Sequence, residues 1–276
     1  MSRVDLLSEG AYRMDGRRPL ELRSMEFKLS PHLAGSTSLV PTSASAAGRP
    51  DGSAQVTQGL TSVCVYIYGP REPGRVSRAP TVRQDRAGIH VEIAVAPWGG
   101  IERRHRTRND RRLLEWSNSI RNTFESVVHT HLYPRSQIDV VVHVMQQDGG
   151  VLPAAINACT LALMDAGIPM SDYVAALTCG LYGSTPLLDL NLTEQSDLPF
   201  VTLAVQPRSG KVPLMLLDTR IHIDRFSAMV GISVDAASVI RDEMDTAMRH
   251  RTEQLAKAMH GVRPELPAEE QMMQDA

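Results

Sequence analysis

The chain has few aromatic residues, few cysteines and no large excess of charge of either sign. Aromatics make up 4% of its 276 residues while hydrophobic residues reach 42%, so the core has to be built from Val, Leu, Ile, Ala and Met. A net charge of −2 excludes a polycation. Any contact with nucleic acid therefore has to come from a local basic patch rather than from the overall charge.

Reactive cysteine patterns and long apolar runs are also absent. Cys64, Cys159 and Cys179 lie in separate apolar stretches and form no Cys-x-x-Cys motif, which favours buried, reduced thiols and an intracellular compartment. No apolar run reaches the length of a membrane span, and the N-terminal residues do not resemble a signal peptide. We therefore expect a soluble intracellular protein with no membrane partner.

The apolar residues recur with two different periods. Alternation, or a short continuous apolar run, predicts strands at 21–30, 53–59, 60–70, 88–97, 136–147, 173–183, 186–192, 200–207 and 211–218. Helical spacing predicts helices over 110–131, 153–166 and 224–257. The second helix has Pro in its first turn, Gly just past its end and apolar residues nearly all round, so it should be buried.

This order of elements predicts an α/β or α+β domain with mixed sheets, spanning residues 1–258. Residues 30–53 are rich in Ser, Ala, Gly and Pro, so we expect a flexible low-complexity loop there. The acidic residues 259–276 are expected to be a disordered tail.

A pair of glycines follows the strand at 136–147. In QQDGGVLPAA, residues 146–155, Gly149 and Gly150 stand between a strand and a helix, where backbone amides often hold a phosphate. The next residues are Val151 and Leu152, which offer an anion neither a hydroxyl nor a charge. The glycines therefore predict either a phosphate cradle or merely a tight turn.

Six arginines fall within ten residues of IERRHRTRNDRR, residues 101–112. They are Arg103, Arg104, Arg106, Arg108, Arg111 and Arg112. Such a cluster favours binding of an RNA backbone without sequence readout, although a solvated loop or a surface that pairs with an acidic neighbour has the same composition. A second basic loop, with Arg71, Arg75 and Arg78, is a weaker candidate. Neither loop carries an aromatic ladder, so base stacking is not expected, and no histidine has metal-ligand spacing.

Five blocks in order resemble the RNase PH family over roughly residues 12–225. They are YRMDGRRPLELR, DGSAQVTQGLTSVCVYIYGPREP, NDRRLLEW, YPRSQIDVVVHVMQQDGG with LALMDAGIPM, and LLDLNLTEQSDLPFVTLAV. The resemblance implies the RNase PH fold, with two βα units of the ribosomal S5 domain 2-like type. It also implies a six-membered ring, the core of the RNA exosome, around a pore that conducts single-stranded RNA.

The resemblance further implies partners and a location. The partners would be RNA, five other RNase PH-like ring subunits, cap proteins with S1 and KH domains, and a ribonuclease II-like hydrolytic nuclease. Arg111 and Arg112 match paired arginines that grip RNA phosphates in relatives. The expected localisation is nuclear, nucleolar and cytoplasmic.

The catalytic residues of active relatives are only partly matched. Those relatives carry Ser or Thr and then Arg after the glycine turn, where Val151 and Leu152 stand here, and two aspartates six residues apart, here Asp189 and Gln195. Neither apolar side chain clamps an anion, and Gln cannot act as a carboxylate acid or ligand. If the strand at 186–192 continued, neighbouring Glu194 would point to the opposite face from Gln195, and Asp197 would need a loop shift.

We therefore expect an inactive subunit with no catalytic residue, no metal and no cofactor. Its expected role is to guide RNA to a separate nuclease during 3′→5′ RNA processing and degradation, including rRNA maturation and mRNA decay. The alternatives are an active phosphate-dependent 3′→5′ exoribonuclease and a free-standing RNA-binding protein of S5-like fold.

Overall fold

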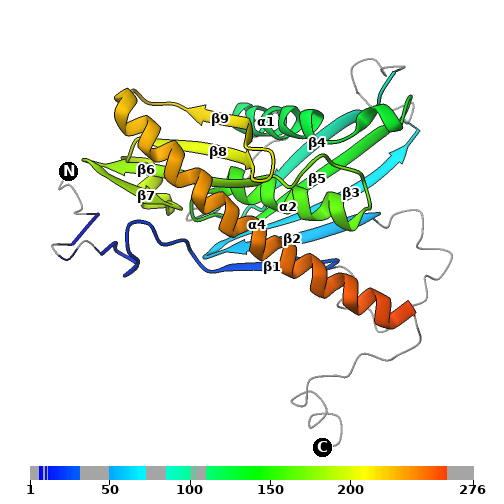
Figure 1. The fold of residues 1–276 in the computed structure, drawn as a ribbon, viewed down its shortest axis with the longest axis horizontal. Coiled ribbons are helices and arrows are strands. Elements are labelled where there is room, and N and C mark those ends of the chain that lie inside the picture. Colours follow the sequence, from blue (N-terminus) through cyan, green and yellow to red (C-terminus); the bar gives the residue numbers. More distant parts are fainter. Residues whose placement is uncertain are drawn as a thin grey trace, which may run out of the picture.

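The two predicted βα units are visible in a computed structural model, which describes residues 6–8, 10, 12–31, 50–72, 85–100, 103 and 110–259. Two sheets lie side by side, and the buried helix α2 (Val151–Asp165) packs against strands of both. The long helix α4 (Ile223–Met259) crosses from the second sheet to the first, and its last turns extend beyond the sheet edge (Figure 1). No helix in the described ranges is both long and apolar enough to cross a membrane.

The first sheet has five strands in the order β1-β2-β3-β5-β4. These are β1 (Met25–Leu29), β2 (Gly52–Gln58), β3 (Thr61–Arg71), β5 (Gln137–Gln146) and β4 (Gly88–Val95). Only β4 and β5 run parallel, so the sheet is mixed as predicted. Strand β3 is central in this sheet, and the β2–β3 hairpin turns at Gly59, which has a positive φ of 58°.

The second sheet has four strands, all antiparallel, in the order β7-β6-β8-β9. These are β7 (Thr185–Leu188), β6 (Ala175–Tyr182), β8 (Phe200–Gln206) and β9 (Lys211–Leu217). Strand β6 lies directly over α2, which is buried along the whole of residues 151–163. The apolar character of that helix on all faces is explained by its position between the sheets.

The predicted helix at 110–131 is α1 (Arg111–Val127), followed by a short 3-10 helix, η2 (Thr130–Leu132). Asp110 is its N-cap, because its side chain accepts a hydrogen bond from the Arg112 backbone N–H at 3.3 Å. Helix α2 begins at Val151, two residues before the predicted start. Val151 and Leu152 are therefore the first helical residues rather than part of a loop.

The prediction of a strand over 186–192 is wrong at its C-terminal end. Strand β7 stops at Leu188, Asp189 has a left-handed φ of 54°, and a helix that was not predicted, α3 (Leu192–Asp197), follows. The physical reason is a capping box. The Asn191 side chain accepts from the third residue of the helix, and Glu194 accepts from the Asn191 backbone N–H.

The predicted low-complexity loop and tail fall mostly outside the described residues. Of the loop at 30–53, residues 32–49 are not described, and its last two residues belong to β2. Of the tail at 259–276, only Met259 is described, as the last residue of α4.

One buried side chain makes the hydrogen bonds that a neighbouring strand would make at Ala176. Strand β7 pairs with β6 only from Cys179 onward, so the outer edge of Ala176 has no neighbouring strand. The Asn157 carboxamide of α2 fills this place: it donates to the Ala176 carbonyl at 2.9 Å and accepts from the Ala176 N–H at 2.7 Å. Asn157 thus joins the central helix to the second sheet.

Replacing Asn157 with Ala should lower the free energy of unfolding by about 2 to 4 kcal/mol, because both Ala176 backbone groups would be left buried without partners. Urea unfolding of the full-length chain measures this. The matched control is Asn122→Ala on the exposed face of α1, which should change stability by less than about 0.5 kcal/mol. Equal effects of the two changes would contradict the role given to Asn157.

Candidate functional site

The glycine pair forms a left-handed turn between β5 and α2. Gly149 has a φ of 76° and Gly150 a φ of 61°, a region that favours glycine. A Cβ on Gly149 would lie 2.5 Å from the Leu190 carbonyl oxygen and from the Asn191 carbonyl carbon. The turn therefore requires glycine both for its conformation and for its close contact with the segment that leads into α3.

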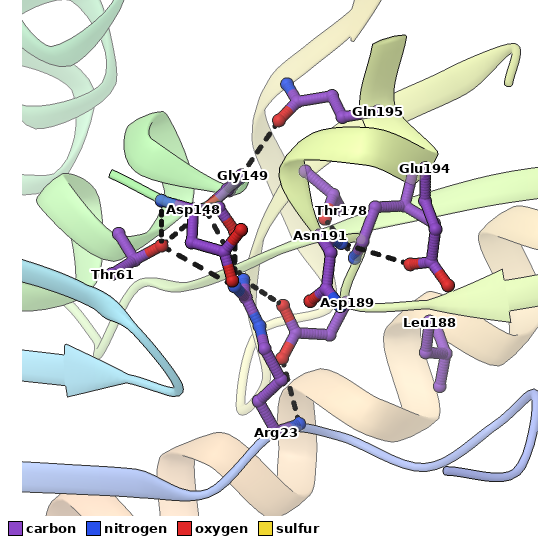
Figure 2. Close-up of polar contacts among 12 residues, drawn as sticks. Arg23, Thr61, Asp148, Gly149, Thr178, Leu188, Asp189, Asn191, Glu194 and Gln195 are labelled. Atoms are coloured by element: carbon purple, nitrogen blue, oxygen red, sulfur yellow. Dashed lines mark hydrogen bonds and ion pairs between the residues drawn. The ribbon is translucent and has the colours of Figure 1, made fainter. Parts of the chain in front are cut away.

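The amide at the start of α2 is already occupied. The Gly150 N–H donates to Oε1 of Gln195 at 3.1 Å, and the Gln195 side chain reaches from α3 toward the turn (Figure 2). In a phosphate cradle this donor would face the anion. Here a neutral carboxamide oxygen takes that place.

The side chains of the next two residues add no donor group. Val151 and Leu152 are 8% and 6% exposed, and both belong to the main hydrophobic core. The sequence predicts that the hydroxyl and guanidinium groups of active relatives are missing here. The side chains in their place, Val151 and Leu152, anchor the first turn of α2 in the core.

Asp189 serves as a structural carboxylate. It is fully buried, and its two oxygens accept from Arg23: Oδ1 from the guanidinium at 2.6 Å and Oδ2 from the backbone N–H at 2.9 Å. Burial would raise the pKa of Asp189, but the hydrogen bonds and charge of Arg23 outweigh it and hold the pKa below its ordinary value. Asp189 therefore fixes its turn through Arg23, a partner that the sequence did not reveal.

Arg23 connects four separate parts of the chain. Besides Asp189, its guanidinium donates to the Asp148 carbonyl at 2.7 Å, and Thr61 of the β2–β3 hairpin donates to the Gly149 carbonyl at 2.7 Å (Figure 2). The N-terminal segment, the hairpin, the glycine turn and the Asp189 turn therefore meet at one guanidinium.

The YRMDGRRP block has a related structural role. The buried Arg13 donates to the carbonyls of Leu188 at 2.5 Å and Asp189 at 3.2 Å, and Arg17 donates to the Asp189 carbonyl and the Asn191 side chain, both at 3.2 Å. The sequence offered these arginines only as part of a resemblance. Their function, fastening the N-terminal segment over the Asp189 turn, required the fold.

The neighbouring carboxylates do not replace the missing one. Glu194 is buried, caps α3 and lies 3.7 Å from Nε of Arg13. The expectation that Glu194 points away from Gln195 assumed a strand, whereas the actual reason is its use in the helix cap. Asp197 is exposed at the last residue of α3. Across the described residues no group of three or more His, Cys, Asp or Glu side chains has the arrangement of a metal site.

A cavity of about 240 Å³ adjoins the glycine turn. Its lining includes Val151, Leu152, Gln195, Trp116 and Arg112. The Arg112 guanidinium carbon lies 4.9 Å from the centre of the Trp116 ring, a cation–π arrangement. Of the two paired arginines, the structure therefore brings Arg112 to the cavity.

The other predicted arginines have different positions. The side chain of Arg111 is 93% exposed and pairs with Glu115 at 3.0 Å. Arg103 is exposed, while Arg104, Arg106 and Arg108 lie outside the described residues. In the second basic loop, Arg71 pairs with Asp139, and positions 75 and 78 are not described. Their RNA contacts remain predictions.

Two of the three cysteines are buried thiols. Burial raises the pKa of the Cys159 thiol far above its ordinary value, and it raises the pKa of Cys179 to about 11. Cys64 is only half-buried, and none of the three cysteines is in a disulfide. The expectation of buried thiols is thus confirmed for Cys159 and Cys179 and wrong for Cys64.

Comparison with protein families gives a match over most of the chain. Residues 21–169 match the model of the 3′ exoribonuclease family, domain 1 (RNase PH), and residues 172–236 match domain 2 of the same family. The chain belongs to the RNase PH family. The boundary between the two matched regions falls between α2 and β6, where the chain passes from the first sheet to the second.

Within the RNase PH family, similar sequences include exosome components. Exosome complex component SKI6 of Saccharomyces cerevisiae is 37% identical over 250 residues, which are 90% of this chain and 95% of the relative. Exosome complex component RRP41 of Homo sapiens is also 37% identical, with the same coverage. The predicted resemblance is thereby confirmed.

Solved structures confirm the RNase PH fold. Rice (Oryza sativa) Rrp46 has a TM-score of 0.71 at 25% identity and covers 86% of this chain and 100% of its own. A subunit of the Archaeoglobus fulgidus exosome with RNA bound to the active site has a TM-score of 0.67 at 20% identity, covering 85% of this chain and 93% of its own. At that identity the likeness concerns the fold alone.

Removing either partner of the Arg23–Asp189 pair should strongly destabilise the protein. Arg23→Met and Asp189→Asn should each cost about 3 to 5 kcal/mol, because each leaves a buried polar or charged group uncompensated. Together they should cost less than the sum of the single changes. The control is Lys28→Met, which breaks the exposed pair with Glu26 and should cost less than about 1 kcal/mol.

The same pair predicts a pH dependence of stability. Because the pKa of Asp189 is lowered in the folded state, its contribution is complete above the unfolded pKa of about 3.9 and is lost as the pH falls through the folded value. The difference in unfolding free energy between wild type and Asp189→Asn should therefore be constant near neutral pH and shrink below about pH 4. A difference that grows on acidification would contradict this assignment.

Proposed function

We propose that this protein is a catalytically inactive subunit of an RNA exosome core ring, which guides single-stranded RNA during 3′→5′ processing and degradation. The observation that carries the proposal is the contact between Gln195 and the Gly150 N–H. A neutral side chain accepts from the Gly150 N–H, at the turn where the family resemblance places a phosphate cradle. The relatives that are exosome components support the assembly part of the proposal.

Phosphorolysis needs two anions to meet, because inorganic phosphate attacks a phosphodiester. Positive charge and donors have to offset their repulsion. At this turn the side chains of Val151 and Leu152 supply neither, and the carboxylate of Asp189 is neutralised by Arg23 rather than free to hold a cation or a proton. Bringing a phosphate dianion against buried apolar side chains is costly without a paired charge.

The proposed guidance of RNA depends on two arginine side chains at the start of α1. Arg112 lies at the cavity and Arg111 is exposed one residue away at the start of α1. A guanidinium holds phosphate without reading sequence, which suits a channel that accepts any RNA. The proposed partners are five RNase PH-like ring subunits, S1/KH cap proteins and a ribonuclease II-like nuclease, and the proposed location is the nucleus, nucleolus and cytoplasm.

An active phosphorolytic enzyme is the alternative, and the kept glycine turn favours it, since the backbone of a cradle is present. The two functions differ in their product. We expect the full-length chain, alone or in its ring without the hydrolytic nuclease, to release no nucleoside diphosphate from an oligonucleotide with phosphate and Mg²⁺. Chromatography of the products checks this, and phosphate-dependent release would establish the alternative.

A triple variant tests whether the missing groups are the cause. Val151→Ser, Leu152→Arg and Gln195→Asp together restore a hydroxyl, a guanidinium and a carboxylate on the kept backbone turn. We expect phosphate-dependent release of nucleoside diphosphate above the wild-type level. Because Leu152 is part of the core, thermal unfolding has to show first that the variant is folded. A folded variant that does not bind phosphate would indicate that more than these three groups is missing.

Charge reversal tests the guidance role. Arg111→Glu with Arg112→Glu in the assembled ring should weaken RNA binding at least about tenfold and reduce its salt dependence, because two phosphate contacts would be lost. The control is Arg121→Glu in the half-buried middle of α1, which should leave RNA binding unchanged. Unaltered protection of RNA by the double variant would exclude both arginines from the RNA route.

A further inference from the structure

A second groove, of about 480 Å³, adjoins the Arg112 cavity. Gln147 and Leu192 line both, so the two grooves lie next to each other beside the glycine turn. Trp98 lines the second groove and is 68% exposed. An exposed indole at the wall of a groove offers a large flat face to a ligand.

Trp98 is held on a rigid turn. The Gly99 N–H donates to the Ala96 carbonyl at 2.9 Å, and the Gln147 N–H donates to the Gly99 carbonyl at 2.8 Å, which ties the turn to the end of β5. A Cβ on Gly99 would lie 2.8 Å from the Met145 carbonyl oxygen, so the turn is packed directly against that strand. The indole is thus presented from a fixed backbone, as a stacking platform requires.

The Arg112 cavity and the second groove differ in the chemistry of their linings. Apart from Trp98, the second groove is lined by the exposed apolar side chains of Leu60 and Met145, by the carboxamide of Gln147 and by Asp148, and no Lys or Arg among the described residues lines it. A phosphate would be repelled there by Asp148. The neutral face and the donor and acceptor edges of a nucleobase fit an indole beside carboxamides.

We propose that Trp98 is a base-stacking platform for single-stranded RNA, and that a nucleobase lies on it while a neighbouring phosphate is held by Arg112. This inference rests on the proposed function, because it assumes that RNA reaches Arg112. It revises the expectation of no stacking, since Trp98 lines a groove that adjoins the Arg112 cavity. The positive charge of Arg112 next to this groove favours RNA over a protein partner.

The chain has two tryptophans, so Trp116→Phe leaves Trp98 as the only indole. In that background the full-length protein is titrated with oligoadenylate and with an abasic oligomer of equal length and charge. Stacking should quench Trp98 fluorescence with oligoadenylate and leave it nearly unchanged with the abasic oligomer. Equal responses to both ligands would overturn the inference.

Affinity gives an independent test in the full-length chain and in its assembled ring. Trp98→Ala should weaken oligoadenylate binding by about 5- to 150-fold, whereas Trp98→Phe should retain most of the affinity. The matched control is Tyr12→Ala, an exposed aromatic that does not line either groove, with no expected change. Trp98 makes few buried contacts, so thermal unfolding should be the same for all variants.

The outcomes separate this inference from the proposed function. If charge reversal at Arg111 and Arg112 weakens RNA binding while Trp98→Ala does not, the stacking platform is wrong and RNA guidance stands. If neither change weakens RNA binding, both fail. If Trp98→Ala leaves RNA affinity unchanged but weakens assembly with another exosome protein, the groove is a protein-docking surface and the inference is overturned.

Discussion

The buried ion pair between Arg23 and Asp189 is the constraint on which the site depends. Asp189 stands in a left-handed turn, a conformation that aspartate tolerates better than most non-glycine residues, and Arg23 holds it there through both its guanidinium and its backbone N–H. The same guanidinium holds the Asp148 carbonyl of the glycine turn. Two segments about 40 residues apart in sequence are thereby fixed against each other, and the space between α2 and α3 acquires its shape.

The glycine turn has the backbone of an anion-binding loop but not the side chains of one. The close approach of Gly149 to Leu190 and Asn191 keeps the backbone of an anion-binding turn, while Gln195 satisfies the Gly150 amide with a neutral oxygen and Val151 joins the core. A polar group that is buried has to be hydrogen-bonded whether or not a ligand is present. Filling the donor from within the protein therefore stabilises the turn without phosphate. The scaffold and the reaction depend on different atoms, so the first can remain when the second is lost.

Several features could be predicted from the sequence because they rest on periodicity or on a local residue choice. Apolar alternation predicted the strands, and the all-apolar pattern predicted the buried helix α2. The loss of donors and of a carboxylate, inferred from Val151, Leu152 and Gln195, stays a prediction. What could not be predicted depended on contacts between distant segments, such as Arg23 with Asp189 and Trp98 beside the Arg112 cavity. Helix α3 is a different case, because Asn191 and Glu194 have capping-box spacing and the signal was available.

The central claim is that the glycine turn no longer receives an anion, and binding of inorganic phosphate to the full-length chain tests it most directly. Isothermal titration at constant ionic strength, with chloride as the reference anion, should give no saturable heat up to about 10 mM phosphate, a concentration that would nearly fill a site of millimolar affinity. Saturable binding that disappears when Gly149 is replaced by Ala would contradict the account, because it would show a working cradle in which Gln195 gives way to phosphate.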